Sequence, residues 1–424
     1  TRITYGAYGS GNKPKLTSFQ SNGKSYVTVT DLEFNTGTTT VVLLANSHHI
    51  TVQNCTIYST ATSWAPGLQL TSNAHHNRIL NCNITLDVYS LNDAVNLRTN
   101  ADYNLFEGNT ITTNGGHGAV SVEGATGGGV ANYNIFRNNT MISTTNGGGT
   151  GIQFAANSDW NIIENNVITG GGANNTARHE ATFKMVTRNN IIRNNILKDN
   201  RVVDAQGLEM EIYEYGGITN SAENNRVYNN VITNILSGAQ ALTIRRSNGT
   251  GYAQNNIFKN NAVYNNGGTN YQTDVDGSFP VNTKNVQMGI AVDSNVRNNY
   301  FFNNLFYKSD DNNILWVNNQ ITSVNTIQTA NPSFYQNNLQ LDPKLDSSFK
   351  PISGSPVIDA GAFLTTVTSP TGSSSTLTVA DAKYFFDGYG IVTGDTIQIG
   401  TQTATITSIN YTTNTLTLNK SISW

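Results

Sequence analysis

Residues 190–197 read NIIRNNIL, and residues 161–168 read NIIENNVI. Both fit the phrase Asn-x-Φ-x-Asn-Asn-x-Φ, in which Φ is an apolar residue. Complete or partial copies of this phrase recur along most of the chain, starting at Val27, Ile50, Asn77, Asn104, Asn134, Asn161, Asn190, Asn225, Asn256 and Asn299. Recurrence at a spacing of about 25 to 45 residues indicates a repeat protein.

Apolar and polar residues alternate within each phrase, which is the pattern of a short strand with one buried face. A second alternating stretch precedes most copies, for example AVNLR at Ala94, GIQFA at Gly151 and ALTIR at Ala241. Two or three short strands per repeat predict an all-β solenoid, a parallel β-helix whose equivalent residues stack ~4.8 Å apart in successive coils. The recurrent Asn residues are expected to form an amide ladder at the turns.

The sequence pattern changes near residue 362. Beyond it the repeats are replaced by alternating stretches rich in Thr and Ser, such as TATITSI at Thr403. We therefore expect a β-helix domain over residues 1–362 and a small C-terminal all-β module over residues 363–424. The segment PISGSPVIDAG, from Pro351 to Gly361, resembles a last coil.

Composition narrows the function. The net charge is −3 and charged residues make up 12% of the chain, which argues against a nucleic-acid partner. No run approaches the ~18 apolar residues of a membrane helix. A polar composition with few charged residues is typical of secreted proteins, and a start at Thr1 is expected of a processed product. We expect an extracellular monomer.

An outward-facing column of ionisable residues is the most informative feature. We aligned the strands that precede the phrases by their inward apolar residues. In this alignment, charged and phenolic side chains occupy the same outward position in different coils. This column holds Arg98, Glu123, Lys184, Tyr213, Arg245 and Asp293. Glu211 points the same way as Tyr213, and the neighbouring residues His179, Glu180, Glu209 and Arg246 complete the candidate site.

These residue types suit the cleavage of a uronate polymer by β-elimination. The C5 proton is removable only when the charge of the adjacent carboxylate is neutralised, for which Arg245 is the candidate. Lys184, with a pKa depressed by burial and neighbouring cations, or Tyr213 could then take the proton and return one to the leaving oxygen. Glu211, Arg98, Glu123, His179, Arg246 and Asp293 are the candidate substrate-binding residues.

The sequence resembles the right-handed β-helix polysaccharide lyases through ITYGAYGSGNKPKLTS at Ile3, the NIIRNN coils and SPVIDAG at Ser355. HEATFKMVTRNNIIRNN at His179 and ALTIRRSN at Ala241 are similar to polysaccharide lyase family 6, which contains alginate lyases and chondroitinase B. This resemblance implies a right-handed helix, with Lys184 as the base and Arg245 as the Arg that accompanies the base in that family. No cofactor is expected to be required, but the resemblance implies a calcium site as a possibility, with Glu180 and Glu209 as candidate ligands and Glu211 nearby.

Other functions remain open at this point. A β-helix glycoside hydrolase would need a carboxyl pair, which Glu211 could form with Glu209 or Glu214. A C5-epimerase would share the first step of the lyase. A non-catalytic glycan-binding β-helix would need only a polar groove with aromatic platforms, for which the candidates are Trp64, Trp160 and Tyr215.

Four weaker patterns remain in the sequence. His117 lies in a GHG triplet that lacks the paired Asp of a polygalacturonase, and DVDG at Asp274 resembles part of a calcium loop. The adjacent pairs His48/His49 and His75/His76 are expected to provide polarity at turns. Cys55 and Cys82 occupy the same position one coil apart and are expected to be buried and reduced.

Overall fold

The computed structural model describes residues 2–37, 39–62, 65–88, 92–114, 118–123, 129–144, 150–155, 157–171, 181–200, 206–215, 218–235, 240–246, 249–267, 286–309, 311, 314–318 and 320–424. The chain divides into two compact units, Thr1–Ala360 and Gly361–Trp424. In the described residues, no helix is long and apolar enough to cross a membrane.

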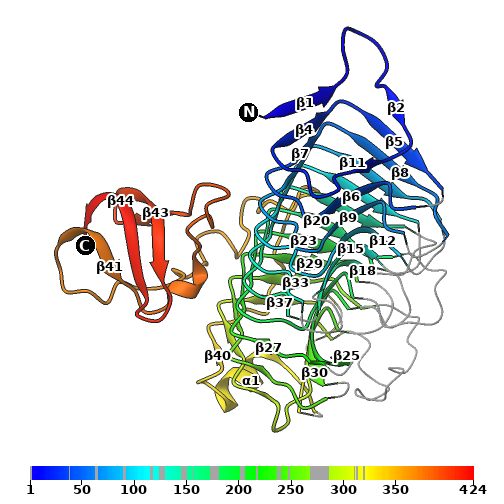
Figure 1. The fold of residues 1–424 in the computed structure, drawn as a ribbon. Coiled ribbons are helices and arrows are strands. Elements are labelled where there is room, and N and C mark those ends of the chain that lie inside the picture. Colours follow the sequence, from blue (N-terminus) through cyan, green and yellow to red (C-terminus); the bar gives the residue numbers. More distant parts are fainter. Residues whose placement is uncertain are drawn as a thin grey trace. The chain divides into compact units, whose positions relative to one another are not determined.

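The first unit is a stack of coils, each of which contributes one short strand to each of three long sheets (Figure 1). Neighbouring strands of a sheet come from successive coils and pair in parallel, as in β10 with β13 and β11 with β14. An antiparallel pair, β38 with β39, ends one sheet. The predicted parallel β-helix is confirmed.

Sheet A consists, in order, of β1 (Ile3–Gly6), β4 (Val27–Thr30), β7 (Thr51–Gln53), β10 (Arg78–Leu80), β13 (Leu105–Glu107), β16 (Ile135–Arg137), β19 (Ile162–Glu164), β22 (Ile191–Arg193), β28 (Arg226–Tyr228), β32 (Ile257–Lys259), β36 (Tyr300–Phe302) and β40 (Tyr335–Gln336). Sheet B consists of β2 (Lys15–Leu16), β5 (Glu33–Thr36), β8 (Thr56–Ser59), β11 (Asn83–Leu86), β14 (Thr110–Thr113), β17 (Thr140–Ser143), β20 (Val167–Thr169), β23 (Ile196–Lys198), β29 (Val231–Thr233), β33 (Ala262–Tyr264) and β37 (Leu305–Tyr307). Sheet C consists of β3 (Phe19–Gln20), β6 (Val42–Ala45), β9 (Leu68–Thr71), β12 (Asp93–Leu97), β15 (Gly118–Glu123), β18 (Thr150–Ala155), β21 (Phe183–Met185), β24 (Leu208–Ile212), β30 (Leu242–Arg246), β34 (Met288–Ile290), β38 (Leu315–Val317) and β39 (Gln320–Thr322).

The core is a set of apolar columns along the helix axis. The middle residue of each sheet A phrase points inward, so its side chain stacks on the equivalent residue of the next coil. Phe106 and Phe136 stack at 4.8 Å between ring centroids, and Phe258 and Phe301 stack at 4.7 Å. Such columns bury apolar surface with few residues per coil, which explains how a chain with 37% hydrophobic residues folds at this length.

Buried Asn side chains link successive coils through two amide ladders. In each rung an Asn accepts, through Oδ1, from the backbone N–H of the equivalent Asn one coil earlier. In most rungs it also accepts from the Nδ2 of that Asn, as Asn195 does from Asn166 at 3.0 Å for both bonds. The first ladder contains Asn77, Asn104, Asn134, Asn161, Asn190, Asn225, Asn256 and Asn299, and the second Asn109, Asn139, Asn166, Asn195, Asn230, Asn261, Asn304 and Asn338.

The two consecutive Asn residues of each phrase have different structural roles. The second belongs to the buried ladder, whereas the first adopts a left-handed conformation, with φ of 55° at Asn165, 55° at Asn194 and 56° at Asn229. Asn tolerates this conformation better than other residues with a Cβ atom. These three residues follow Glu164, Arg193 and Tyr228, which are in register, so they occupy the same place in successive coils as predicted.

The stack of coils continues beyond the last recognisable phrase, which starts at Asn299. The helix α1 (Val324–Ala330), capped by the Ser323 hydroxyl, precedes β40, and Asn338 is the last member of its ladder. The prediction that Pro351–Gly361 forms a last coil is wrong. Turns occupy this segment, including Gly354 with a φ of 77°, and Pro351 forms only an isolated antiparallel bridge with Leu345.

Short strands complete the first unit: β25 (Glu214–Tyr215) pairs with β26 (Ile218–Thr219), and β27 (Ala222–Glu223), β31 (Ala253–Gln254) and β35 (Val296–Arg297) form a small sheet. The second unit is an antiparallel sheet in the order β41 (Ser373–Thr378), β44 (Thr415–Ser423), β43 (Gln402–Asn410) and β42 (Thr396–Ile399), with the 3-10 helix η1 (Ala382–Tyr384). Cys55 and Cys82 are buried and free, as expected.

Replacing a ladder Asn should destabilise the protein far more than replacing its sequence neighbour. Asn195→Ala removes bonds to Asn166, Asn230 and the Ile163 carbonyl and leaves buried groups unsatisfied. We expect the free energy of unfolding to fall by about 2–4 kcal/mol. The matched control is Asn194→Gly, because glycine accepts the φ of 55° at this exposed position. Urea unfolding checks both, and equal losses would contradict the ladder's role.

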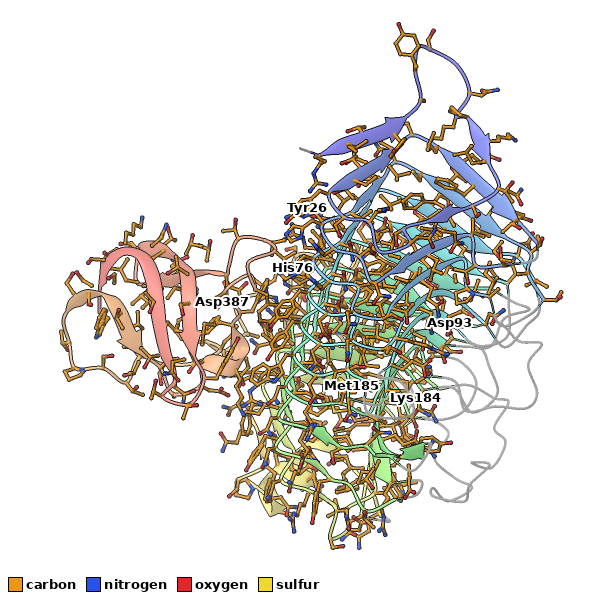
Figure 2. The ribbon with its side chains drawn as sticks, in the orientation of Figure 1. Tyr26, His76, Asp93, Lys184, Met185 and Asp387 are labelled. Atoms are coloured by element: carbon orange, nitrogen blue, oxygen red, sulfur yellow. The ribbon has the colours of Figure 1, made fainter. Side chains whose placement is uncertain are left out.

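Aromatic rings form a separate column at one turn of the first coils. Tyr26, His49, His76, Tyr103, Tyr133 and Trp160 all have positive φ. Consecutive rings are stacked at 4.8, 5.3, 5.1, 4.8 and 6.3 Å (Figure 2 labels Tyr26 and His76). Beside it His48 stacks on His75, and the Nδ1 atoms of His48 and His49 lie 2.8 Å apart, while those of His75 and His76 lie 2.9 Å apart. Each of these short contacts needs one Nδ1 with a hydrogen and one without.

The histidine array should make stability fall on acidification. Burial lowers the pKa of His49, His75 and His76 below 6.5, as do neighbouring imidazoles, with Arg2 and Arg78 acting on His49 and only Asp102 opposing at His75. The unfolded chain therefore binds protons first, so stability is complete above pH ~6.5 and is lost as the pH falls through the lowered pKa values.

Urea unfolding at about pH 7.5 and about pH 5 measures this effect. A double variant, His75→Asn with His76→Asn, should show a smaller loss between the two pH values than the natural sequence. The same pH dependence in both proteins would assign the loss to other groups.

Candidate functional site

The charged residues of sheet C meet on three adjacent strands. Lys184 lies on β21 between the inward residues Phe183 and Met185 (Figure 2 labels Lys184 and Met185). Glu209 and Glu211 lie on β24, and Arg245 lies on β30. Alternation along each strand turns these side chains to the outer face of the sheet.

The register of the strands differs from the predicted column. Lys184 pairs with Glu209, and Glu211 pairs with Arg245, so Tyr213 does not lie between Lys184 and Arg245. The expected column of Lys184, Tyr213 and Arg245 is therefore wrong: Tyr213 lies four residues beyond the partner of Lys184 and two residues beyond the partner of Arg245. Lys184 instead continues a polar column that contains Gln69, Asn96, Ser121 and Gln153.

Two carboxylates and two cations form one network, the four-charge cluster of Lys184, Glu209, Glu211 and Arg245. Lys184 Nζ lies 2.5 Å from Glu211 Oε2 and 3.8 Å from Glu209 Oε2. Arg245 Nε donates to Glu209 Oε1 at 2.6 Å, and Arg245 Nη2 lies 3.3 Å from Glu211 Oε1. Each cation thus bridges both carboxylates.

Exposure differs sharply within the four-charge cluster. The side chains of Glu209, Glu211 and Arg245 are 0%, 3% and 1% exposed, whereas that of Lys184 is 24% exposed. A buried charge is tolerated only when it is paired, and here the formal charges sum to zero. Lys184 is therefore the member of the cluster that solvent or a ligand reaches.

The pKa of Lys184 is raised, not depressed. Burial alone would lower it, and Arg245 acts in the same direction, but the charges of Glu209 and Glu211 and the hydrogen bond to Glu211 outweigh both. The expectation of a depressed pKa at Lys184 is wrong because two carboxylates, Glu209 and Glu211, lie beside it and stabilise its charged form. The raised pKa keeps Lys184 an ammonium ion, which cannot act as a base.

Tyr213 follows β24 directly and remains beside the cluster. Lys184 Nζ lies 5.6 Å from the centroid of the half-buried Tyr213 ring, within the range of a cation–π contact. The phenol is thus close to the one exposed cation of the cluster. Glu214, by contrast, is exposed and starts the separate strand β25.

The other predicted binding residues lie on both sides of the cluster. Towards the first coils, Arg98 Nη2 contacts Glu123 Oε1 at 3.0 Å, and Ser121 donates to the same oxygen at 2.9 Å. On the other side, Arg246 Nε lies 2.9 Å from Asp293 Oδ2. The side chains of Arg246 and Asp293 are 43% and 32% exposed.

Several sequence predictions fall outside the described residues: His179, Glu180, Trp64, His117, the side chain of Tyr215, and Asp274 with Gly277. Trp160 is described and stacks on Tyr133 at 6.3 Å in the aromatic column. The role of Glu209 as a full partner of both cations was missed, although its alternation with Glu211 on one strand was a usable signal.

A cavity of about 320 Å³ lies elsewhere, near the last coils and α1. Its lining contains Val292, Arg297, Phe334 and Tyr335 together with Asn and aliphatic side chains. Among the described residues no carboxylate lines this cavity, so it has no counterpart of the paired ions of the four-charge cluster.

Comparison with known proteins identifies the architecture. A family model described as "Right handed beta helix region" matches residues 17–184. The chain is a right-handed parallel β-helix. A search of curated proteins found none that matches the sequence.

Three solved structures are similar to this β-helix. The PL6 family polysaccharide lyase Pedsa3628 from Pseudopedobacter saltans is 17% identical with a TM-score of 0.40, over 84% of this chain and 89% of that one. A mannuronic acid specific family 6 lyase from human gut microbiota is 12% identical with a TM-score of 0.38, over 78% and 77%. The PL6 family alginate lyase AlyGC is 15% identical with a TM-score of 0.38, over 85% and 52%. At these identities the similarity concerns the fold alone.

Removing one member of the four-charge cluster should destabilise the β-helix strongly. Arg245→Met leaves Glu209 and Glu211 buried beside a single cation, and we expect a loss of about 3–5 kcal/mol in the free energy of unfolding. The matched control is Arg246→Met, which breaks a solvent-exposed pair with Asp293. That loss should stay below about 1 kcal/mol. Chemical denaturation distinguishes them, and similar small losses would show that the pairing of Arg245 is dispensable.

Proposed function

We propose that the protein is a secreted polysaccharide lyase that cleaves a uronate-containing polysaccharide by β-elimination. The observation that carries the proposal is the single exposed cation of a buried, neutral cluster, with a phenol 5.6 Å away. An ammonium held in place by buried carboxylates is preorganised to meet an anionic group, and a uronate supplies one in every sugar unit.

Lys184 would serve as the electrostatic partner of the substrate carboxylate. Neutralising that carboxylate makes the neighbouring C5 proton acidic enough to be removed, because negative charge develops on the carboxylate in the transition state. Arg245 is too deeply buried to touch a substrate, with 1% of its side chain exposed. It is a positioning residue, since its bonds to Glu209 and Glu211 hold the carboxylates that orient Lys184.

Tyr213 is the candidate for proton transfer. As a phenolate beside the Lys184 ammonium it would accept the C5 proton, and the electron pair of the C5–H bond would form the C4–C5 double bond. The C4–O bond would break, and the proton on Tyr213 would pass to the departing oxygen. This sequence leaves Tyr213 as it began and yields one unsaturated and one saturated chain end.

The contacts favour this reaction over hydrolysis. A glycoside hydrolase needs one carboxylic acid that gives a proton to the leaving group. Both Glu209 and Glu211 are engaged by cations, and both are almost fully buried, which suits neither an acid nor a nucleophile.

Turnover should collapse when either proposed group is removed. Lys184→Ala should lower kcat/KM at least ~100-fold, the scale of losing one preorganised charge. Tyr213→Phe should lower kcat by about 10²–10⁴-fold because proton transfer is lost. The assay is absorbance of unsaturated products in the near ultraviolet, screened over alginate, pectate and glycosaminoglycans.

A matched control is Lys198→Ala on sheet B, where Lys198 pairs with Asp199 and has a similarly exposed side chain, 29%. Its activity should match the natural sequence. New reducing ends without unsaturation would instead assign hydrolysis, and inverted C5 configuration without cleavage would assign epimerisation. Full activity of both the Lys184 and Tyr213 variants would contradict the mechanism.

A further inference from the structure

The resemblance to family 6 lyases implies calcium beside Glu209, so the fit of that ion to these residues can be examined. Calcium takes six to eight oxygen ligands at 2.3–2.6 Å. Glu209 Oε1 and Glu211 Oε1 are committed to Arg245, and Glu211 Oε2 is committed to Lys184. In the described part of the chain, no group of three or more His, Cys, Asp or Glu side chains could hold a metal ion.

Charge gives a second, independent reason for a poor fit. The carboxylates of Glu209 and Glu211 contribute two negative charges, and Lys184 and Arg245 contribute two positive charges. A divalent ion added to this cluster would leave two uncompensated positive charges beside side chains that are 0–3% exposed. Uncompensated charge at such depth is strongly unfavourable.

We infer that the Lys184 ammonium is a built-in cation that takes the place of a divalent metal ion between Glu209 and Glu211. Lys184 Nζ lies 2.5 Å from Glu211 Oε2 and 3.8 Å from Glu209 Oε2, the two oxygens that face it. Glu209 Oε2 is fully buried and makes no hydrogen bond among the described residues, and the Lys184 ammonium 3.8 Å away is a charge that compensates it. The protein therefore folds, and binds its anionic ligand, without a metal at this position.

This inference predicts an effect of replacing Lys184 that is not expected for an ordinary surface lysine. Removing the ammonium, as in Lys184→Ala, leaves the cluster with a net charge of −1 and turns two carboxylate oxygens towards the space it filled. Divalent ions bind oxygen ligands of this kind. The variant should gain calcium binding that the natural sequence lacks, whereas Lys184→Arg should not, because it retains a cation.

The experiment compares thermal unfolding of the full chain in about 5 mM CaCl2 and in EDTA. The natural sequence and Lys184→Arg should unfold at the same Tm in both. Lys184→Ala should unfold at a Tm at least about 2 °C higher in calcium. No calcium response in a folded Lys184→Ala protein would contradict the inference, because the carboxylates would then not form a cation site.

A second measurement stands even if Lys184→Ala does not fold. Calorimetric titration of the natural sequence with CaCl2 should show no calcium binding at Glu209. Calcium binding by the natural sequence that is lost in Glu209→Gln would overturn the inference. These measurements do not use activity, so they fail or succeed independently of the proposed function. Where the proposed function holds, product formation should also be the same in EDTA and in calcium.

Discussion

The buried Asn amide ladders are the constraint on which the rest of the structure depends. Each ladder Asn satisfies the backbone N–H of the coil before it, and this pairing requires the coils from Asn104 to Asn304 to present an Asn at the same two places. This requirement holds the coils in phase even though the loops between them differ in length. Because the coils are in phase, residues far apart in sequence, such as Lys184 and Arg245, reach one cluster.

The same architecture explains how four ionised side chains can be buried on an outer sheet face. The strands of sheet C hold Glu209 and Glu211 rigidly, with Lys184 and Arg245 one strand away on either side. Opposite charges held at short, fixed distances offset much of the desolvation cost of burying these ions. The result is a fixed positive charge at Lys184 that faces outward, supported by residues that the solvent does not reach.

The fold was predictable from the sequence because its signal is repeated in every coil. The phrase NIIRNNIL contains the inward apolar residues, the left-handed Asn194 and the ladder residue Asn195. The site was only partly predictable. Alternation assigns a side chain to a face, but a slip of two residues keeps every side chain on the same face, so it leaves the register open. For this reason the predicted column placed Lys184 level with Tyr213, whereas β21 pairs Lys184 with Glu209. The burial of Arg245 likewise depends on tertiary contacts that no local pattern reports.

The charge state of Lys184 tests the central claim most directly. Nuclear magnetic resonance of lysine side chains labelled with ¹³C and ¹⁵N follows each ammonium through a pH titration. The account predicts that the Lys184 signal remains that of an ammonium beyond the ordinary pKa of 10.5, because Glu209 and Glu211 raise its pKa. Loss of the proton from Lys184 between about pH 7 and 8 would contradict the account and restore this residue as a candidate base.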